Sequence, residues 1–466
     1  MITYIKINGF KSFHNFEMEF TPLTIIAGTN ASGKSNLFDA LMLLSRLAEV
    51  DKLQNAFKEQ RGEMVELFTQ YSDNEYASEM EFIVEMLVNK DVKDAWGGEA
   101  KLKYTRLKYE LKIKRFINES GMNDLEVIHE SLVKLKHDKD SWINIIQKNY
   151  RDFWRPKVKT GRRGTPYIST EKINDMPAII VPQDGEGGNK RSFPLKNATK
   201  TVLSSFDTID FRHILAAKEE MKSWKFLQLN PGDLRQPTSK KSGDDKISSS
   251  GENLAAALYR IKIQDDYSLI QISRALGNFL PNFTDVNVID DKENSQFLIK
   301  LKGVDGKEYT SRVLSEGTLR LLALCILQFD ESFTGLLCFE EPENGIHPFR
   351  IKAMAKLLKD LSTDFSDLEM PLRQVIVNTH SPALVLEMVR FKNDKNVSVH
   401  YSEMKTSTMT INNKRICFNY SKITKYIDKV IDGYQQKIEF TEQDIKLTLA
   451  TINEFLNSSE QEIIRY

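Results

Sequence analysis

The sequence predicts an α/β protein with a parallel sheet that binds phosphate at one edge. Three stretches of the 466 residues support this prediction. The first combines a strand, a glycine-rich loop and a helix over residues 23–44. The other two are late apolar strands that end in polar residues, at 335–341 and 374–380. Ligands collect at the carboxyl ends of strands in open α/β sheets, so we expect the three strand ends to meet around one nucleotide.

The glycine-rich loop is Gly28-Thr29-Asn30-Ala31-Ser32-Gly33-Lys34-Ser35, which fits the pattern G-x-x-x-x-G-K-[ST] without a mismatch. A glycine turn before an ordinary helix is the alternative, but the flanking strand and helix favour a phosphate site. We expect Lys34 to reach the β- and γ-phosphates and the Ser35 hydroxyl to ligate Mg²⁺. The other candidate nucleotide-binding residues in this region are Gly28, Asn30, Ser32, Gly33 and Asn36.

The composition does not by itself indicate nucleic-acid binding or a membrane location. Lys plus Arg and Asp plus Glu each total 65, so the net charge is zero. No uninterrupted apolar run is long enough to span a bilayer, and the N-terminus has no signal-peptide pattern, so we expect a cytoplasmic protein. The cysteines Cys325, Cys338 and Cys417 have no paired spacing, which favours core packing over a disulfide or a metal site.

A motif at the start of an apolar helix provides a second candidate anion site. Ser315 and Gly317 lie in Leu314-Ser315-Glu316-Gly317-Thr318, just before the run from Leu321 to Phe329. A serine at a helix N-terminus can cap the helix, and the free N–H groups there attract anions. This motif is weak alone, because Ser-x-Gly before a helix is common.

Paired acids end the strand at 335–340, and a histidine ends the strand at 374–379. Clustered carboxylates at a strand end are poorly explained by packing, since charged residues are rarely buried unpaired. A nearby Mg²⁺ would explain them, with Glu340 holding the metal through water and Glu341 polarising the attacking water. A lone histidine is usually structural, but the position of His380 makes it a candidate γ-phosphate sensor.

Together these motifs resemble the ABC-type ATPase heads of the SMC and RecF group. Gly28–Ser35 resembles a Walker A motif, Leu314–Thr318 an ABC signature, Leu336–Glu341 a Walker B motif and His380 the switch histidine. The stretch Asn8-Gly9-Phe10-Lys11-Ser12-Phe13 adds to the likeness. The resemblance implies an ABC-type P-loop ATPase head that uses ATP and Mg²⁺, with a mixed α+β insertion and a helical C-terminal tail.

Two stretches narrow the resemblance to the OLD (overcoming-lysogenisation-defect) family and to related anti-phage ATPases of the Septu, retron and PARIS systems. They are Glu340–Pro348 and Asn378–Pro382. The resemblance implies a homodimer or higher oligomer that closes head to head around ATP, and a separately encoded effector, an HNH or Toprim nuclease. Residues 381–466 contain no Asp-x-Asp, so we expect no Toprim site and no nuclease activity in this chain.

On this basis the chain is expected to divide into four parts. These are 1–84, the first part of the ATPase head; 85–225, an inserted α+β module; 226–415, the second part of the head; and 416–466, a helical tail. The pattern at 198–229 is helical, and residues 230–251 read as a flexible loop. Residues 150–164 interleave aromatic and basic residues, which suits nucleic acid or, as the favoured alternative, a solvated loop.

Three departures from the family pattern leave the rate of hydrolysis open. Glu340 stands where Asp is usual, Glu316 stands where Gly is commoner, and Gln70 is only a guess for the Q-loop residue. The leading hypothesis is an ATP-hydrolysing regulator in anti-phage defence. The alternatives are a RecF-like ATPase of DNA repair or DNA structure, in which residues 150–164 touch DNA, and a scaffold that binds ATP without hydrolysing it.

Overall fold

The core sheet lies at the centre of the molecule and carries the phosphate loop. The computed structural model describes residues 1–157, 165–185, 189–391, 393–411, 413–426 and 454. The strands of the core sheet follow the order β14 (Lys225–Leu227), β19 (Gly335–Glu340), β20 (Arg373–Thr379), β3 (Leu23–Ala27), β21 (Val397–Ile411) and β22 (Lys414–Lys425). Neighbouring strands from β14 to β21 pair in parallel, and β21 and β22 form an antiparallel hairpin.

These strands form because their apolar runs are buried on both faces, as is typical of parallel sheets. Every residue of β3 and β20 is buried, and β19 is buried up to the half-buried Glu340. All these strands end in the same direction. The predicted meeting of the three polar strand ends is therefore confirmed for β3, β19 and β20.

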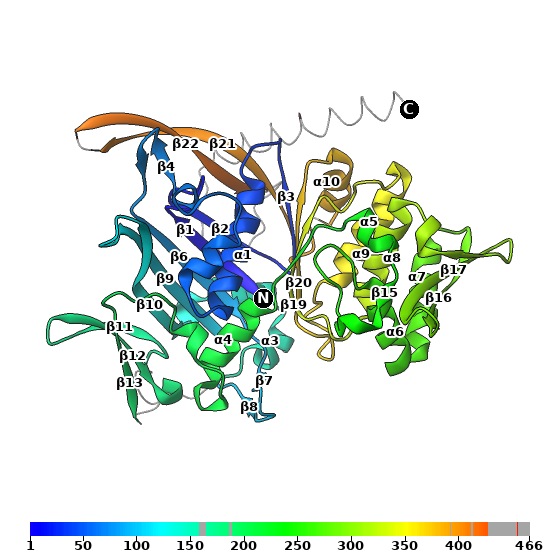
Figure 1. Ribbon diagram of the computed structural model, residues 1–466, viewed down its shortest axis with the longest axis horizontal. Coiled ribbons are helices and arrows are strands. Elements are labelled where there is room, and N and C mark those ends of the chain that lie inside the picture. The colour runs from blue at the N-terminus through cyan, green and yellow to red at the C-terminus, as the bar shows by residue number, and fades with distance from the viewer. Residues whose placement is uncertain (158–164, 186–188, 392, 412, 427–453, 455–466) are drawn as a thin grey trace.

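One face of the core sheet is covered by α1 (Lys34–Glu49) and α4 (Arg212–Lys222), which separate it from an antiparallel sheet (Figure 1). That second sheet follows the order β10 (Asn123–Lys134), β9 (Arg106–Ile117), β6 (Glu79–Leu87), β1 (Ile2–Asn8) and β2 (Phe16–Glu19). Leu37 and Leu41 of α1 pack in one cluster with Ile5 of β1 and Ile26 of β3. A single hydrophobic core therefore joins the two sheets.

The opposite face is covered by α8 (Glu316–Phe329), α9 (Ile351–Leu361) and α10 (Pro382–Val389), as Figure 1 shows. A helical lobe continues this second core. It contains α5 (Pro231–Arg235), β15 (Thr238–Ser239), α6 (Leu254–Gln264), α7 (Asp266–Phe279), β16 (Phe283–Asp291), β17 (Gln296–Gly303) and β18 (Glu308–Thr310). Because α1 and α8 belong to different cores, they lie on opposite faces of the core sheet.

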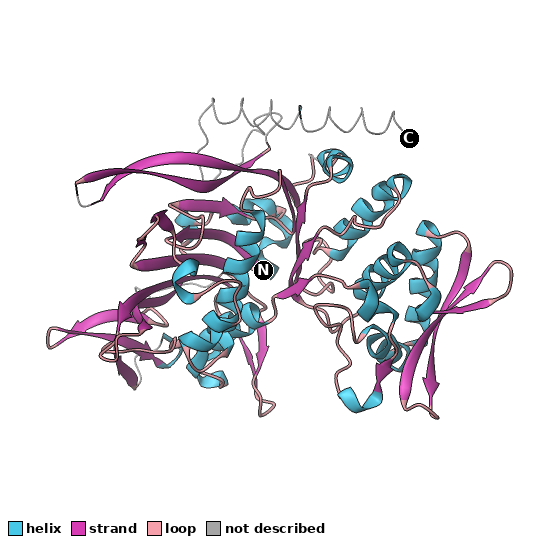
Figure 2. Cartoon of the chain, turned by 45° about the horizontal axis from the view of Figure 1, so that its top comes forward, coloured by secondary structure: helices cyan, strands magenta, loops and turns pink. Residues whose placement is uncertain are grey.

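Smaller elements decorate this frame. They are α2 (Leu53–Lys58), β4 (Gln70–Ser72), β5 (Glu75–Tyr76), β7 (Asp91–Lys93), β8 (Glu99–Lys101), α3 (Lys148–Trp154), β11 (Ser169–Ile173), β12 (Met176–Pro182) and β13 (Lys190–Pro194). Figure 2 shows the β21–β22 hairpin projecting beyond the core sheet. Among the described residues, no helix has the length and apolar character needed to cross a membrane.

The α/β fold class is confirmed, but all three expected boundaries fall inside strands. The 84/85 boundary cuts β6, the 225/226 boundary cuts β14 and the 415/416 boundary cuts β22. Strands β9 and β10 extend the sheet that begins with β1, because their alternating apolar residues complete the same core. Residues 85–225 are therefore not a separate module.

Two local predictions are also wrong. Residues 416–425, expected to be helical, belong to β22, because alternate side chains such as Ser421 and Ile423 are buried at the core sheet. The rest of the expected tail, apart from residue 454, lies outside the described residues. The segment 198–229 is α-helical only over α4, after two short 3-10 helices, and its later part contains β14. The expected loop at 230–251 contains α5 and β15.

Candidate nucleotide-binding site

The phosphate loop connects β3 to α1 and is held by the β21–β22 hairpin. Gly28 and Gly33 adopt φ angles of 150° and 90°. A Cβ at Gly33 would lie 1.7 Å from Ser421 Oγ, and one at Gly28 would lie 2.4 Å from the Ser402 carbonyl oxygen. Both positions therefore require glycine, through backbone geometry at Gly33 and close approach at both. The loop shape depends on a hairpin nearly 400 residues later in the chain.

Lys34 points back into its own loop. Its Nζ donates hydrogen bonds to the carbonyl oxygens of Gly28 at 2.8 Å and Thr29 at 2.7 Å. Burial lowers the pKa of this ammonium, while the nearby carboxylates of Glu341 and Glu340 act to raise it. A buried ammonium that is held by carbonyl oxygens and faces two carboxylates is well placed to exchange these contacts for phosphate oxygens.

Ser35 opens α1 and contacts the end of the neighbouring Walker B-like strand. Its hydroxyl donates to Glu340 Oε1 at 2.7 Å. The Asn378 side-chain amide, at the end of β20, donates to the same carboxylate oxygen at 3.2 Å and to Ser35 Oγ at 3.4 Å. A hydroxyl and a carboxylate in contact are oxygen ligands of the kind that Mg²⁺ prefers.

The surroundings of this pair also suit a bound metal and nucleotide. Two buried side-chain atoms near the loop, Ser32 Oγ and Asn378 Oδ1, have no hydrogen-bond partner in the described part of the chain. Such atoms are costly unless a ligand or water satisfies them. The described residues contain no group of three or more His, Cys, Asp or Glu that could hold a metal alone. Water and phosphate would have to complete a Mg²⁺ shell at Ser35 and Glu340, which is the usual arrangement for this ion.

Glu341 and His380 face each other across the ends of β19 and β20. His380 Nδ1 lies 2.9 Å from Glu341 Oε1, and the Asn344 side-chain amide donates to Glu341 Oε2 at 2.7 Å. Glu341 adopts a φ of 48°, an unusual value for a non-glycine residue, and its N–H donates to the Asn378 carbonyl at 2.8 Å. Strained backbone that is fixed by its neighbours is typical of functional sites.

The start of the chain also reaches the phosphate loop, next to Ser421 of the β21–β22 hairpin. The Asn36 side-chain amide donates to Ser12 Oγ at 2.7 Å, and the Ser12 and Ser421 hydroxyls are 2.7 Å apart. Lys11 instead pairs with the buried Asp39 of α1 at 2.7 Å. The sequence alone did not decide whether Lys11 and Ser12 face the nucleotide or solvent. In the structure, both side chains contact the first turns of α1.

Ser315 and Gly317 lie on the other face of the core sheet. Ser315 caps α8: its Oγ accepts from the Thr318 N–H at 3.3 Å. Gly317 packs against the loop that follows Glu341, where a Cβ would lie 2.2 Å from the Gly345 carbonyl oxygen. No hydrogen bond among the described residues joins Ser315 or Gly317 to the phosphate loop. The structure therefore gathers all the predicted site residues except Ser315 and Gly317. Asn30 lies in the phosphate loop itself, where it is exposed.

The guess for the Q-loop residue does not fit the structure. Gln70 begins β4 and pairs with Tyr76 in a separate two-stranded ribbon. Gln228 directly follows β14, whose Leu227 is paired with Phe339, so Gln228 is level with Glu340. The sequence analysis did not single out Gln228, because the three residues of β14 are too few to show the alternation of apolar and polar residues that marks a strand. The signal that remained was a glutamine at the end of a short apolar run.

Residues 150–164 show structural roles where they are described. Trp154 Nε1 donates to the Phe365 carbonyl at 3.0 Å, and Arg155 pairs with the buried Asp140 at 2.8 Å. Residues 158–164, which include Arg162 and Arg163, lie outside the described residues. The described part of this segment therefore packs into the protein, and the nucleic-acid interpretation stays untested.

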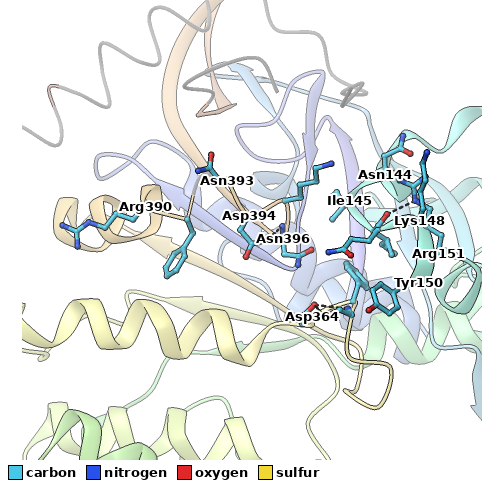
Figure 3. Close-up of a pocket in the computed structure, with 16 residues that line it drawn as sticks. Asn144, Ile145, Lys148, Tyr150, Arg151, Asp364, Arg390, Asn393, Asp394 and Asn396 are labelled. Atoms are coloured by element: carbon cyan, nitrogen blue, oxygen red, sulfur yellow. Dashed lines mark hydrogen bonds between the residues drawn. The ribbon is translucent and has the colours of Figure 1, made fainter. Parts of the chain in front are cut away.

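A separate pocket of about 830 Å³, drawn in Figure 3, lies among the loops that precede β20 and β21, and no residue of the phosphate loop lines it. Asn144, Arg151, Asp364 and Asn396 are among its lining residues. Because it adjoins the amino ends of core strands, it lies at the edge of the sheet opposite the phosphate loop. It takes no part in the nucleotide site.

The fold and the site define an α/β protein with a P-loop nucleotide-binding site. The family described as "AAA domain, putative AbiEii toxin, Type IV TA system" matches residues 23–387 by its sequence profile. The chain belongs to this family. A search of curated proteins found no match.

Solved SMC head domains are similar to this chain at low identity. The SmcHead bound to the C-winged helix domain of ScpA is 14% identical, with a TM-score of 0.48 over 91% of this chain and 97% of that chain. The SMC head domain from Thermotoga maritima is 13% identical, with a TM-score of 0.38 over 91% and 99%. The Smc head domain with a coiled coil and joint from Pyrococcus yayanosii is 11% identical, with a TM-score of 0.42 over 97% and 99%.

Proposed function

We propose that this protein binds and hydrolyses ATP with Mg²⁺ and uses the cycle as a switch. The observation that carries the proposal is the meeting of Lys34, the Ser35–Glu340 pair and the Glu341–His380 pair at one edge of the core sheet. These are the parts that phosphoryl transfer to water needs: a cation for the phosphates, oxygen ligands for the metal, and a base near the attacking water. Lys34 and Ser35 follow β3, Glu340 and Glu341 lie at the end of β19, and His380 follows β20.

Each residue has a distinct task in this proposal. Lys34 leaves the Gly28 and Thr29 carbonyls and binds the β- and γ-phosphates. Ser35 and Glu340 would hold Mg²⁺, which would supply positive charge to the phosphates when bound. Glu341 orients the attacking water and accepts its proton, and His380 contacts the γ-phosphate. Gln228 takes the position that the sequence analysis assigned to Gln70.

The signature motif acts on a second copy of the chain. Ser315 is exposed at the N-terminus of α8, on the face of the core sheet opposite α1. None of its described hydrogen bonds reaches its own phosphate loop, so we assign it to the γ-phosphate held by the partner in a head-to-head homodimer. Glu316 does not block an anion there, because Arg320 Nη2 pairs with its carboxylate at 2.9 Å.

The proposed biological role is a cytoplasmic sensor that controls a separate effector, an HNH or Toprim nuclease, in anti-phage defence. Its support is the resemblance of Glu340–Pro348 and Asn378–Pro382 to OLD-type ATPases, together with a family whose description names an AbiEii toxin. A second candidate is a scaffold that binds ATP without turnover. Glu340 in place of Asp favours it, because the longer side chain alters how the metal can be held.

The test is steady-state ATP hydrolysis by the wild type, Lys34→Ala and Glu341→Gln, with mass measured in the same buffer. We expect Lys34→Ala to lose ATP binding. Glu341→Gln should bind ATP and form a stable dimer while losing about 100-fold or more in turnover. ATP binding without turnover in the wild type would favour the scaffold. A monomer in Glu341→Gln with saturating ATP would rule out the head-to-head switch.

A further inference from the structure

Glu343 is a buried acid in the loop that follows β19, two residues after Glu341. Its side chain is 8% exposed. The Thr379 hydroxyl donates a short hydrogen bond to Glu343 Oε1 and accepts one from the Ser381 N–H at 2.9 Å. Since Thr379 and Ser381 flank His380, one hydroxyl group ties both neighbours of the histidine to Glu343.

The loop that carries Glu343 also touches the other parts of the site. Glu341 lies two residues before it and contacts His380 at 2.9 Å. Gly345 lies two residues after it and packs against Gly317 of the signature motif. The N–H of Ile346 donates to the Glu343 carbonyl at 3.0 Å, which closes the turn. Glu343 is thus the residue of this turn whose side chain bonds to β20.

Stability alone explains Glu343 poorly. Its Oε2 is buried and has no hydrogen-bond partner in the described part of the chain. Burial raises the pKa of the carboxyl, against the effect of the hydrogen bond from Thr379. An apolar residue of similar size would avoid the cost of burying this group. An acid retained at such a cost, next to a catalytic pair, points to a task in that pair's geometry.

We propose that Glu343 is a positioning residue that holds His380 against Glu341 through the Thr379 hydroxyl. The inference rests on the proposed ATP hydrolysis, and it adds Glu343 and Thr379 to the residues that support this activity. The Glu343 carboxyl group accepts a hydrogen bond from the Thr379 hydroxyl, which fixes the position of the Thr379 oxygen. That oxygen in turn accepts a hydrogen bond from the Ser381 N–H. His380 is held between these two anchors, where its Nδ1 meets Glu341 Oε1.

The test compares removal and conservative replacement on both sides of this hydrogen bond. Glu343→Ala and Thr379→Val should lower kcat about 10- to 100-fold, the cost expected for a misplaced catalytic group. Their affinity for ATP should stay within about twofold of the wild type, because the group acts on turnover and not on ground-state binding. Glu343→Gln and Thr379→Ser keep the acceptor and the hydroxyl, so both should restore most of kcat.

The matched control is Thr363→Val. Thr363 is also a buried threonine bonded to β20, but it accepts from the Arg373 N–H at 2.6 Å, at the far end of the strand. The substitution Thr363→Val should lower the melting temperature and leave kcat unchanged. A kcat loss in Thr363→Val equal to that in Thr379→Val would overturn the inference, as would unchanged kcat in folded Glu343→Ala. No turnover in the wild type would instead defeat the proposed function itself.

Discussion

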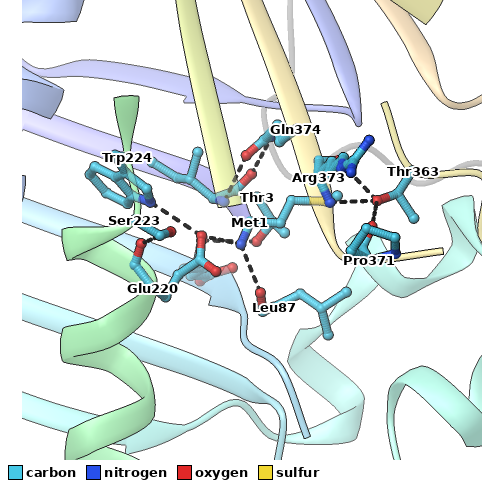
Figure 4. A network of polar contacts seen from close by, with 12 residues as sticks. Met1, Thr3, Leu87, Glu220, Ser223, Trp224, Thr363, Pro371, Arg373 and Gln374 are labelled. Atoms are coloured by element: carbon cyan, nitrogen blue, oxygen red, sulfur yellow. Dashed lines mark hydrogen bonds and ion pairs between the residues drawn. The ribbon is translucent and has the colours of Figure 1, made fainter. Parts of the chain in front are cut away.

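The two ends of β20 bury polar side chains in opposite ways. At the amino end, Arg373 donates to the carbonyl oxygens of Phe333, Gln328 and Asp330 at 2.8, 3.0 and 2.7 Å. Gln374 uses both parts of its amide: Nε2 donates to the Ile2 and Thr21 carbonyls, and Oε1 accepts from the Ile2 N–H. Figure 4 shows Gln374 in its hydrogen bonds, Arg373 with its N–H donating to Thr363, and the nearby Glu220 carboxylate, which accepts from Trp224 Nε1.

The carboxyl end is left partly unsatisfied. Asn378 is as deeply buried as Gln374, yet its Oδ1 has no partner in the described part of the chain, and the same holds for Glu343 Oε2 and Ser32 Oγ. Both ends belong to one strand, which is buried along its whole length. The two ends of β20 therefore do not differ in burial. They differ in how completely their buried polar atoms are hydrogen-bonded. A closed network stabilises the fold, while an open one has capacity for a ligand.

The largest expected effect comes from breaking the closed end. Arg373→Met should destabilise the protein by about 3 to 5 kcal/mol, because three buried carbonyl oxygens lose their donors. Thermal unfolding measures the loss. Below the lowered melting temperature, ATP binding per folded molecule should match the wild type, since Arg373 lies at the edge of the sheet opposite the phosphate loop.

Arg390→Met is the matched control for this prediction. Arg390 is an exposed arginine that pairs with Glu387 on the same helix-end segment at 2.7 Å. Exposed pairs of this kind contribute less than about 1 kcal/mol, so the melting temperature should hardly move. Equal losses of melting temperature in Arg373→Met and Arg390→Met would show that the buried hydrogen-bond network contributes no more to stability than an exposed ion pair.

A smaller effect concerns His400, a buried histidine of β21. Burial, aided by the charge of Lys425, lowers the pKa of His400 from 6.5 to about 3. Between these values the unfolded chain binds a proton that the folded chain does not, so stability falls as the pH falls below 6.5. Going from pH 7 to pH 5 should cost roughly 2 kcal/mol from this residue.

His400→Gln removes the titrating group and should flatten that part of the stability profile. The measurement is the melting temperature at pH 7 and pH 5 for both proteins, at fixed ionic strength. The variant starts from a lower value, since the His400 Nε2 contact to Ser398 Oγ at 3.1 Å is disturbed. Parallel profiles for the two proteins would mean that His400 does not contribute to acid destabilisation.

Much of the core sheet could be predicted because its strands are apolar runs that end in polar or charged residues of recognisable motifs. The strands around residues 23–27, 335–340 and 374–379 are β3, β19 and β20. The strand β14 was missed because three residues show no period, and its place depends on pairing with β19. Strands β9 and β10 carry alternating apolar residues, but which sheet they join depends on long-range pairing that their sequence does not encode locally.

The site divides in the same way. The phosphate loop, Glu340, Glu341 and His380 follow patterns of residue type and spacing, so the sequence located them. The support from Ser421 and Ser402 was invisible, because serines in a late hairpin show nothing of a contact across almost 400 residues. Asn378 and Glu343 were within recognised motifs, yet their tasks depend on which atoms are left without partners. Only coordinates show that.

The smallest expected effect sharpens the contrast between the two amides of β20. Asn378→Ala removes the donor that bridges Glu340 Oε1 and Ser35 Oγ, so the Mg²⁺ concentration for half-maximal ATP hydrolysis should rise about tenfold. Its melting temperature should fall less than that of Gln374→Met, because the two hydrogen bonds lost are long, at 3.2 and 3.4 Å, and Oδ1 has no partner to lose in the described part of the chain. Gln374→Met should do the reverse: lower the melting temperature and leave the Mg²⁺ dependence unchanged. If both substitutions changed the same quantity, the open end of β20 would be a structural element like the closed one, and its unsatisfied atoms would not mark a ligand site.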